Sequence, residues 1–163
     1  MCTRVARAVL LRGPSTSPLG NRVWVIVGIQ RLCICDWSNS NRRDVVVLDP
    51  PWPQVEAAIR ALNNRNLNDV YLTPLAAQSE TFLGIGGGSG QYLLTGAVAG
   101  KTFPTLVTAL NLDDSLVPLV VGGQLGEYPA RWLVSLDDAL SAARAFFDAG
   151  GFDCGVEWAY PRG

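Results

Sequence analysis

The stretch GIGGGSGQYLLTG, residues 84–96, decides how the rest of the chain is interpreted, because it places five glycines within seven residues. A dinucleotide-binding fingerprint needs glycines at positions i, i+2 and i+5, followed by a helix. Here the third position falls on Ser89 or Gln91, depending on which glycine is taken as the first. A phosphate-binding P-loop needs Gly-Lys-Ser/Thr, and the single lysine of the chain lies outside this stretch. Neither nucleotide motif fits.

The residues after the glycines, QYLLTGAV, are typical of a β-strand and contain no helix start. Glycine adopts positive φ angles without steric cost, and tight turns between antiparallel strands require such angles. The stretch therefore predicts a hairpin turn, with a ligand-binding or partner-binding loop as the alternative. A second run, GGQLGEY at 122–128, resembles GGSGQY at 87–92 and also indicates a glycine turn that leads into a following segment.

Strand-like segments surround this hairpin on both sides. Apolar and β-branched runs predict strands at 23–29, 31–36, 45–48, 69–73, 81–85, 91–98, 116–121, 131–134 and 155–160. The run at 45–48, VVVL, is apolar throughout and predicts a short buried strand.

Two segments have helical periodicity. In the first, about 53–63, Val55, Ile59 and Leu62 share one face. The second begins at Ser135, a good N-cap residue, and is closed by the glycines at 150–151. Strands that follow strands, with one helix in each half, predict an α+β fold: a mostly antiparallel sheet with two main helices packed on one face.

The 163 residues are enough for a single domain with a real core. Residues 1–20 contain a cluster of Pro, Ser and Gly and predict a flexible lead-in, followed by one α+β domain at 21–163. The apolar part of the lead-in is too short for a signal peptide, and no apolar run of the chain is long enough to span a bilayer. We therefore expect a cytoplasmic protein without membrane contact.

The chain has no histidine, which excludes Ser-His-Asp and Cys-His nucleophile systems and most catalytic zinc sites. No other nucleophile, base and oxyanion site can be assembled, so we expect neither enzymatic activity nor a cofactor. The net charge of −1 argues against direct nucleic-acid binding. The charge is uneven, however: residues 1–65 carry nine Arg and four acidic residues, whereas residues 104–163 carry three Arg and eight acidic residues.

Four cysteines are present, and two of them, Cys33 and Cys35, lie two residues apart in an apolar run. On a strand their side chains point to the same face. We interpret them as reduced core cysteines and expect no metal site, because a closed structural zinc site needs four ligands. A metal, redox or disulfide role stays open as the alternative.

The C-terminal run RWLVSLDDALSAARAFFDAGGFDCGVEW, residues 131–158, resembles the first-numbered Imm family of immunity proteins from bacterial polymorphic toxin systems. The matching pieces are Val134-Ser135-Leu136-Asp137-Asp138-Ala139-Leu140, Ala143, Phe146-Phe147, Gly150 and Trp158. The glycine stretch fits the same family, and the resemblance covers about 52–163.

The resemblance implies a protein that neutralises the catalytic domain of a cognate toxin by tight binding, the toxin commonly being a deaminase of nucleic-acid bases. The family offers no catalytic residues to transfer to this chain. Candidate partner-binding residues come instead from the acidic half: a nucleic-acid-modifying toxin needs a basic cleft, which an acidic patch can occupy. These candidates are Asp113, Asp114 and Glu127 in predicted loops, with Tyr128 and Trp132 as neighbouring anchors.

Two alternatives accompany this hypothesis. Asp113 and Asp114 also fit an ordinary solvated turn, whereas Asp137 and Asp138 are better explained by helix capping than by partner contact. The whole chain also fits a small ligand-binding or regulatory α+β domain without a toxin partner, in which the glycine turns form the rim of a pocket.

Overall fold

The fold was analysed in a computed structural model that describes residues 28–38, 42–74, 80–107, 113–152 and 157–160. The helical elements are α1 (Trp52–Arg60), the 3-10 turn η1 (Ala130–Trp132) and α2 (Leu136–Ala149). The strands are β1 (Ile29–Asp36), β2 (Arg43–Leu48), β3 (Leu67–Pro74), β4 (Phe82–Gly88), β5 (Gln91–Ala97), β6 (Thr105–Leu106), β7 (Leu116–Val121), β8 (Gln124–Pro129), β9 (Leu133–Val134) and β10 (Trp158–Ala159). The lead-in predicted at 1–20 and most of the strand predicted at 23–29 lie outside the described residues.

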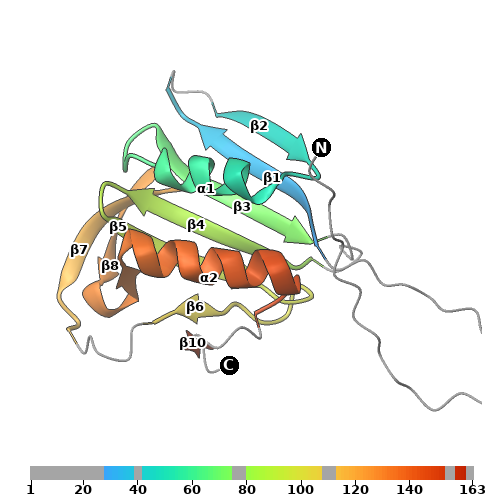
Figure 1. The fold of residues 1–163 in the computed structure, drawn as a ribbon. Helices are drawn as coiled ribbons and strands as arrows, with labels where there is room; N and C mark the ends of the chain where they lie inside the picture. The colour runs from blue at the N-terminus through green and yellow to red at the C-terminus, as the bar shows by residue number, and fades with distance from the viewer. Residues whose placement is uncertain (1–27, 39–41, 75–79, 108–112, 153–156, 161–163) are drawn as a thin grey trace, which may run out of the picture.

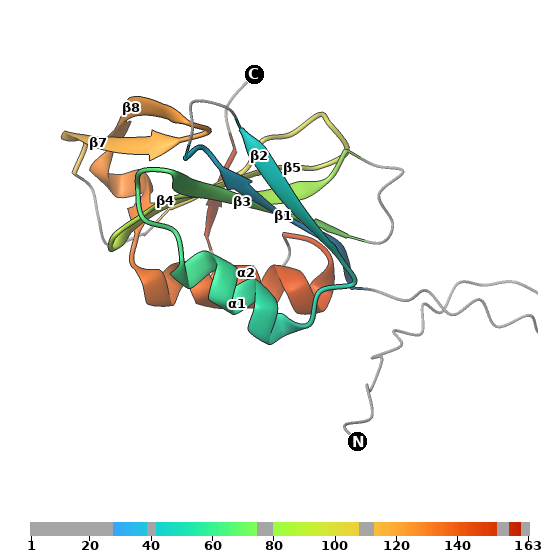
Figure 2. The same cartoon turned by 90° about the horizontal axis from the view of Figure 1, so that it is seen from above.

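The strands form one antiparallel sheet in the order β10-β6-β5-β4-β3-β1-β2, with β9 paired to β5. The remaining strands, β7 and β8, pair only with each other. Figures 1 and 2 show three layers: α1 and α2 side by side on one face of the sheet, the sheet itself, and the β7–β8 hairpin on the other face. The predicted α+β fold, with its mostly antiparallel sheet and two helices on one face, is confirmed.

The core lies between the helices and the sheet. Both helices present the apolar stripes that the sequence predicts, and the fully buried side chains Ile59 and Phe146 lie within this core. The hydroxyl of Ser135 accepts a hydrogen bond from the amide of Asp138, and Gly150 ends α2 in the left-handed conformation. These are the caps expected from the sequence.

The glycine stretch forms the predicted hairpin, but its glycines do not all lie in the turn. Only Ser89 and Gly90 form the turn, both with positive φ, and β4 pairs with β5 from Phe82↔Ala97 to Gly88↔Gln91. The other four glycines belong to β4 itself. Gly84 and Gly86 serve close packing, whereas Gly87 and Gly88 combine close packing with positive φ angles that other residues rarely adopt.

Three expectations about the strands need correction. The run at 45–48 forms a strand at the sheet edge and not a buried one: Val45 is 54% exposed and Leu48 is 69% exposed. The strand predicted at 131–134 begins as the 3-10 turn η1. Glu127, predicted to lie in a loop, belongs to strand β8, because tertiary pairing with β7 outweighs the weak β-propensity of a segment with Gly126 and Pro129.

Candidate functional site

The β7–β8 hairpin packs directly on two glycines of β4. A Cβ atom placed on Gly86 would lie 2.6 Å from a methyl carbon of Val121, and one on Gly87 would lie 2.9 Å from a methyl carbon of Leu119. Leu119 is fully buried as a result. The glycines of the opening stretch thus create a flat platform on which the hairpin rests.

Three side chains from one neighbouring segment hold the backbone of the hairpin. The amide of Val120 donates to Oδ1 of Asn64 over 2.7 Å. At the hairpin turn, the amide of Gly122 donates to Oδ1 of Asp69, and that of Gly123 donates to Oδ1 of Asn68, each over 3.0 Å. These bonds join segments more than 50 residues apart in the sequence, and they place the hairpin at a defined position on the sheet.

A β-bulge explains how two consecutive residues serve the same turn. Between β1 and β3, Cys35 pairs with Asp69 but Asp36 pairs with Leu67, so Asn68 is an extra residue in β3. Because the bulge interrupts the alternation of faces, Asn68 and Asp69 can both reach the hairpin turn. Both are buried, and a buried polar group needs such partners.

The two faces of the hairpin differ in character. Val117, Leu119 and Val121 point toward the sheet, whereas Leu116 and Pro118 point away from it, because side chains alternate along a strand. On β8 the residues opposite the outward positions include Glu127, which pairs with Pro118, and Leu125, which pairs with Val120. Leu116 is 58% exposed and Leu125 is 71% exposed. The hairpin therefore presents apolar side chains and a carboxylate to solvent.

The predicted acidic pair lies where the chain enters this hairpin. The carboxylate of Asp113 accepts hydrogen bonds from the amide and the hydroxyl of Ser115, both over 2.8 Å, and these bonds lower the pKa of Asp113 below its usual value. Asp114 pairs with Arg131 at 2.9 Å, a contact that the sequence analysis did not anticipate. The backbone amide of Arg131 also donates to the carbonyl of Asp113.

We call the exposed set formed by Asp113, Asp114, Leu116, Leu125 and Glu127 the outer hairpin surface. Three carboxylates against one guanidinium, that of Arg131, leave this surface negatively charged. Glu127 lies within strand β8 and not in a loop as predicted.

Of the two predicted aromatic anchors, Tyr128 lies on the opposite side of the hairpin from the exposed leucines. Tyr128 pairs with Val117 on the side of the hairpin that faces the sheet, and its ring lies 2.9 Å from the place where a Cβ of Gly126 would be. Trp132 ends η1 and is partly buried. A flat partner that covers Glu127 therefore approaches from the side opposite to Tyr128.

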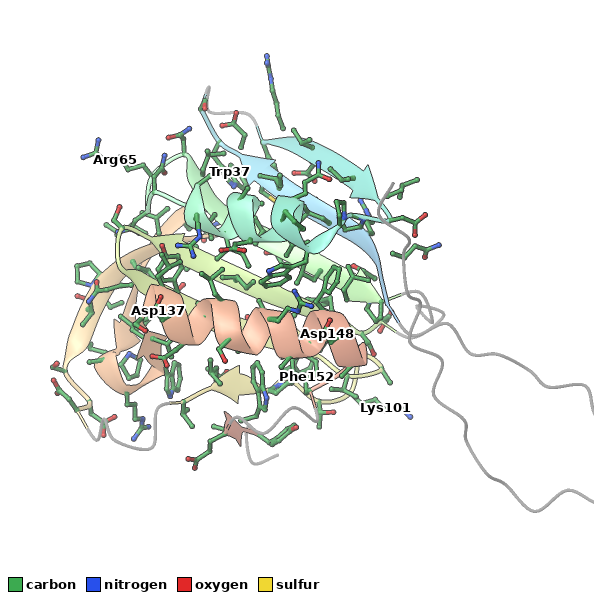
Figure 3. The ribbon with its side chains drawn as sticks, viewed as in Figure 1. Trp37, Arg65, Lys101, Asp137, Asp148 and Phe152 are labelled. Atoms are coloured by element: carbon green, nitrogen blue, oxygen red, sulfur yellow. The ribbon has the colours of Figure 1, made fainter. Side chains whose placement is uncertain are left out.

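Asp137 and Asp138 belong to α2, as the capping interpretation requires. Asp138 accepts a hydrogen bond from the hydroxyl of Ser135 over 2.7 Å. Figure 3 shows Asp137 and Asp148 near the two ends of α2, and Asp148 forms an ion pair with Arg144 at 2.8 Å. These acidic residues lie on the helical layer, apart from the outer hairpin surface.

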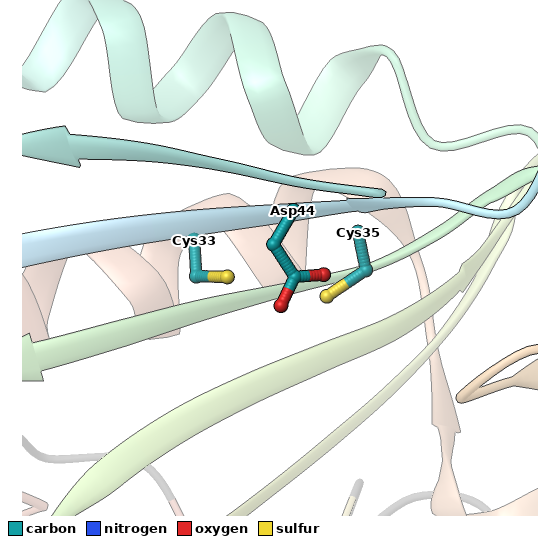
Figure 4. A group of neighbouring side chains, drawn as sticks. All are labelled: Cys33, Cys35 and Asp44. Atoms are coloured by element: carbon teal, nitrogen blue, oxygen red, sulfur yellow. The ribbon is translucent and has the colours of Figure 1, made fainter. Parts of the chain in front are cut away.

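A second group of polar side chains lies on β1 and on β2, which is the edge strand of the sheet. Cys33 and Cys35 point to the same face of β1, as predicted, and are free and buried. One carboxylate oxygen of Asp44 and the two sulfurs lie within 4.8 Å of one another. Figure 4 shows Asp44 between the cysteines, with the sulfurs turned toward its carboxylate. We call Cys33, Cys35 and Asp44 the thiol–carboxylate cluster.

The surroundings of this cluster are strongly charged. Arg42 donates to both oxygens of Asp44, over 2.6 and 2.8 Å, and lowers the pKa of Asp44. Burial raises the pKa of the Cys35 thiol, and the carboxylate of Asp69 raises it further. A buried thiol with a raised pKa is a poor nucleophile, so Cys35 is unsuited to thiolate catalysis.

Asp44 and Asp69 cannot be recognised from the sequence alone as neighbours of the cysteines. The i, i+2 spacing of the cysteines revealed their common face, but only the register of β1 with β2 and β3 shows that Cys35 lies opposite both Asp44 and Asp69. Strand register depends on contacts far apart in the sequence and has no local signal of its own here.

No protein-family model, no curated protein and no solved structure matches this chain. Among the helices in the described part of the chain, none has the length and apolar character that crossing a membrane requires.

Proposed function

We propose that this protein is an immunity protein that binds the catalytic domain of a cognate toxin, a nucleic-acid deaminase, and blocks its active site through the outer hairpin surface. The observation that carries the proposal is the exposure, on the β7–β8 hairpin and the segment that leads into it, of two leucines, Leu116 and Leu125, and of three carboxylates, those of Asp113, Asp114 and Glu127. The resemblance of residues 131–158 to immunity proteins supplies the identity of the partner.

The chemistry of this surface suits such a partner. Exposed apolar side chains surrounded by polar ones are typical of protein interaction sites. The carboxylates complement the positive cleft that an enzyme acting on nucleic acid needs for its substrate, and complementary charge accelerates association.

The anchoring of the hairpin also supports binding. The hydrogen bonds that the hairpin amides donate to Asn64, Asn68 and Asp69 hold the hairpin backbone before any partner arrives. A surface that is already ordered loses less conformational entropy on association, which raises affinity.

The experiment is calorimetry with the catalytic domain of the toxin encoded beside this protein, together with an assay of deaminase activity. We expect one-to-one binding with a Kd on the order of nanomolar or tighter, as toxin–immunity pairs show, and complete loss of activity. Absence of binding, or binding that leaves the activity intact, contradicts the proposal.

Charge variants then test the surface. The triple variant D113N/D114N/E127Q removes the carboxylates of the outer hairpin surface, and E56Q/D148N/E157Q removes three exposed or half-exposed carboxylates elsewhere. Measured by stopped flow, the first variant should slow association about tenfold and flatten its salt dependence, whereas the second should change it less than about twofold. Equal effects of the two variants would exclude this surface as the point of contact.

A further inference from the structure

We propose that the thiol–carboxylate cluster is a binding site for a divalent, thiophilic metal ion such as Zn²⁺, with Cys33, Cys35 and Asp44 as ligands and Asp69 as the fourth. This inference is independent of the proposed toxin partner. It revises the expectation, drawn from the sequence, that the cysteines are only core residues.

The first argument is the geometry of the donor atoms. The two sulfurs and a carboxylate oxygen of Asp44 already lie within 4.8 Å of one another. A Zn–S bond of about 2.3 Å places the two sulfurs of a tetrahedral site about 3.8 Å apart. The two cysteines share one face of β1, and Asp44 is directly paired with Cys35 in the register of β1 and β2, so the three donors are already held around one point.

The second argument concerns the fourth donor. This donor lies outside the group of three atoms that are within 4.8 Å of one another, on the strand next to the cysteines. Asp69 lies opposite Cys35 on the other side of β1 and is only 1% exposed. Its Oδ1 accepts the amide of Gly122, whereas its Oδ2 is buried and accepts no geometrically adequate hydrogen bond from the described residues. A buried carboxylate oxygen without a hydrogen bond is costly, and coordination of a cation would satisfy it.

The third argument is charge. The carboxylate of Asp44 and the two thiols converge here, and the buried carboxylate of Asp69 belongs to the residue that pairs with Cys35 on β3. The one cation that faces the cluster from the described elements is Arg42, whose guanidinium holds both oxygens of Asp44. Arg42 is exposed, so a metal ion that replaces it breaks an exposed ion pair, and the guanidinium also lies over the Trp37 ring, 5.9 Å from its centroid.

The chemistry requires no redox partner. A metal ion that binds both cysteines releases the two thiol protons to the buffer, while Asp44 exchanges the guanidinium of Arg42 for the metal. Soft thiolate donors combined with carboxylates favour Zn²⁺ over Mg²⁺ or Ca²⁺, which prefer oxygen ligands alone.

The experiment uses Co²⁺ as a spectroscopic probe in the full chain carrying C2S/C154S, so that Cys33 and Cys35 are its only thiols. We expect one Co²⁺ per chain, a near-ultraviolet sulfur-to-metal charge-transfer band and intense visible bands of tetrahedral coordination, all abolished by one equivalent of Zn²⁺. A weak octahedral spectrum, or no change on addition of Co²⁺, overturns the proposal without any variant of the site.

Substitutions at two exposed residues, Asp44 and Arg42, then test the assigned ligands. D44N should weaken Zn²⁺ binding by at least about tenfold, a loss that even supporting residues of metal sites produce. R42Q removes the competing cation and should tighten binding by roughly two- to fivefold, the size of an exposed ion pair. Binding that is unaffected by D44N, or weakened by R42Q, contradicts the assigned ligands.

Discussion

The two faces of the sheet are covered by different means. On one face, α1 and α2 bury continuous apolar stripes, and the contacts are those of side chain against side chain. On the other face, the β7–β8 hairpin rests on glycines and is held by hydrogen bonds to Asn64, Asn68 and Asp69. The helical face supplies stability through burial, whereas the hairpin face combines precise polar contacts with an exposed outer surface.

The helical face stabilises the fold, whereas the hairpin face carries the surface that we propose binds the toxin. Burial is non-directional and tolerates alternative packing, so it fixes the layers but no particular chemistry. Hydrogen bonds to one hairpin turn have defined geometry and position the outer hairpin surface.

The largest expected effect is on the helical face. Phe146→Ala removes a fully buried ring from α2 and should lower the free energy of unfolding by about 3–5 kcal/mol, measured by urea denaturation. The matched control is Phe103→Ala, because that ring is 54% exposed and its removal should cost well under half as much. Similar losses for the two variants would break the distinction between the buried and exposed positions.

On the hairpin face we expect a steric effect that a second substitution relieves. A Cβ on Gly86 meets Val121 at 2.6 Å, so Gly86→Ala should destabilise by about 1–3 kcal/mol. Val121→Ala in the same chain makes room for that Cβ, and a double-mutant cycle should give a favourable coupling of about 0.5–3 kcal/mol. Gly28→Ala is the control, because a Cβ there meets no atom within 4 Å among the residues that the structure describes. If the effects of Gly86→Ala and Val121→Ala on the free energy of unfolding simply add, the packing described for the hairpin is contradicted.

A smaller effect concerns the hydrogen bonds of the hairpin turn. Asn68→Ala leaves the amide of Gly123 without its acceptor and should cost about 1–3 kcal/mol. The characteristic result is local: amide hydrogen exchange should accelerate at Gly123, while the amides of α2 keep the protection expected from global stability alone. Uniform acceleration across both layers would instead indicate that Asn68 acts on the whole fold.

The smallest effect is a dependence on alkaline pH. Burial, with a further contribution from Asp69, raises the pKa of Tyr71 to about 12, from about 10 in an unfolded chain. The folded state therefore holds the phenol proton more tightly, and this contribution to stability is complete below about pH 10 and is lost as the pH rises from 10 to 12. In a titration of tyrosinate absorbance, Tyr71→Phe should remove a component that titrates near pH 12. Loss of a component that titrates near pH 10 instead would be inconsistent with the raised pKa.

The features that the sequence predicted correctly have local signals. Ser135 and Gly150 cap α2 through bonds within a few residues, and the positive φ of Gly90 suits a tight hairpin turn. Strand β8 and the edge position of β2 were not predicted, because each depends on which strand lies beside it. A run of valines gives the same pattern in a central strand as in an edge strand.

The candidate site likewise combines features that have a local sequence signal with features that depend on strand pairing. The sequence singled out the acidic residues of the C-terminal half, and it placed Asp113 and Asp114 correctly in an exposed segment. It did not reveal the ion pair between Asp114 and Arg131 or the exposed leucines that share the surface, because these follow from the register of β7 with β8. The bulge at Asn68 likewise cannot be recognised from the amino-acid composition of β3.

The most direct test of the central claim is hydrogen–deuterium exchange of this protein, alone and bound to the catalytic domain of the toxin. The account predicts that binding protects peptides from 113–129, which contain the outer hairpin surface, and leaves those from 136–149 in α2 unchanged. Protection confined to the helical layer, with the hairpin exchanging at its free rate, would contradict the account.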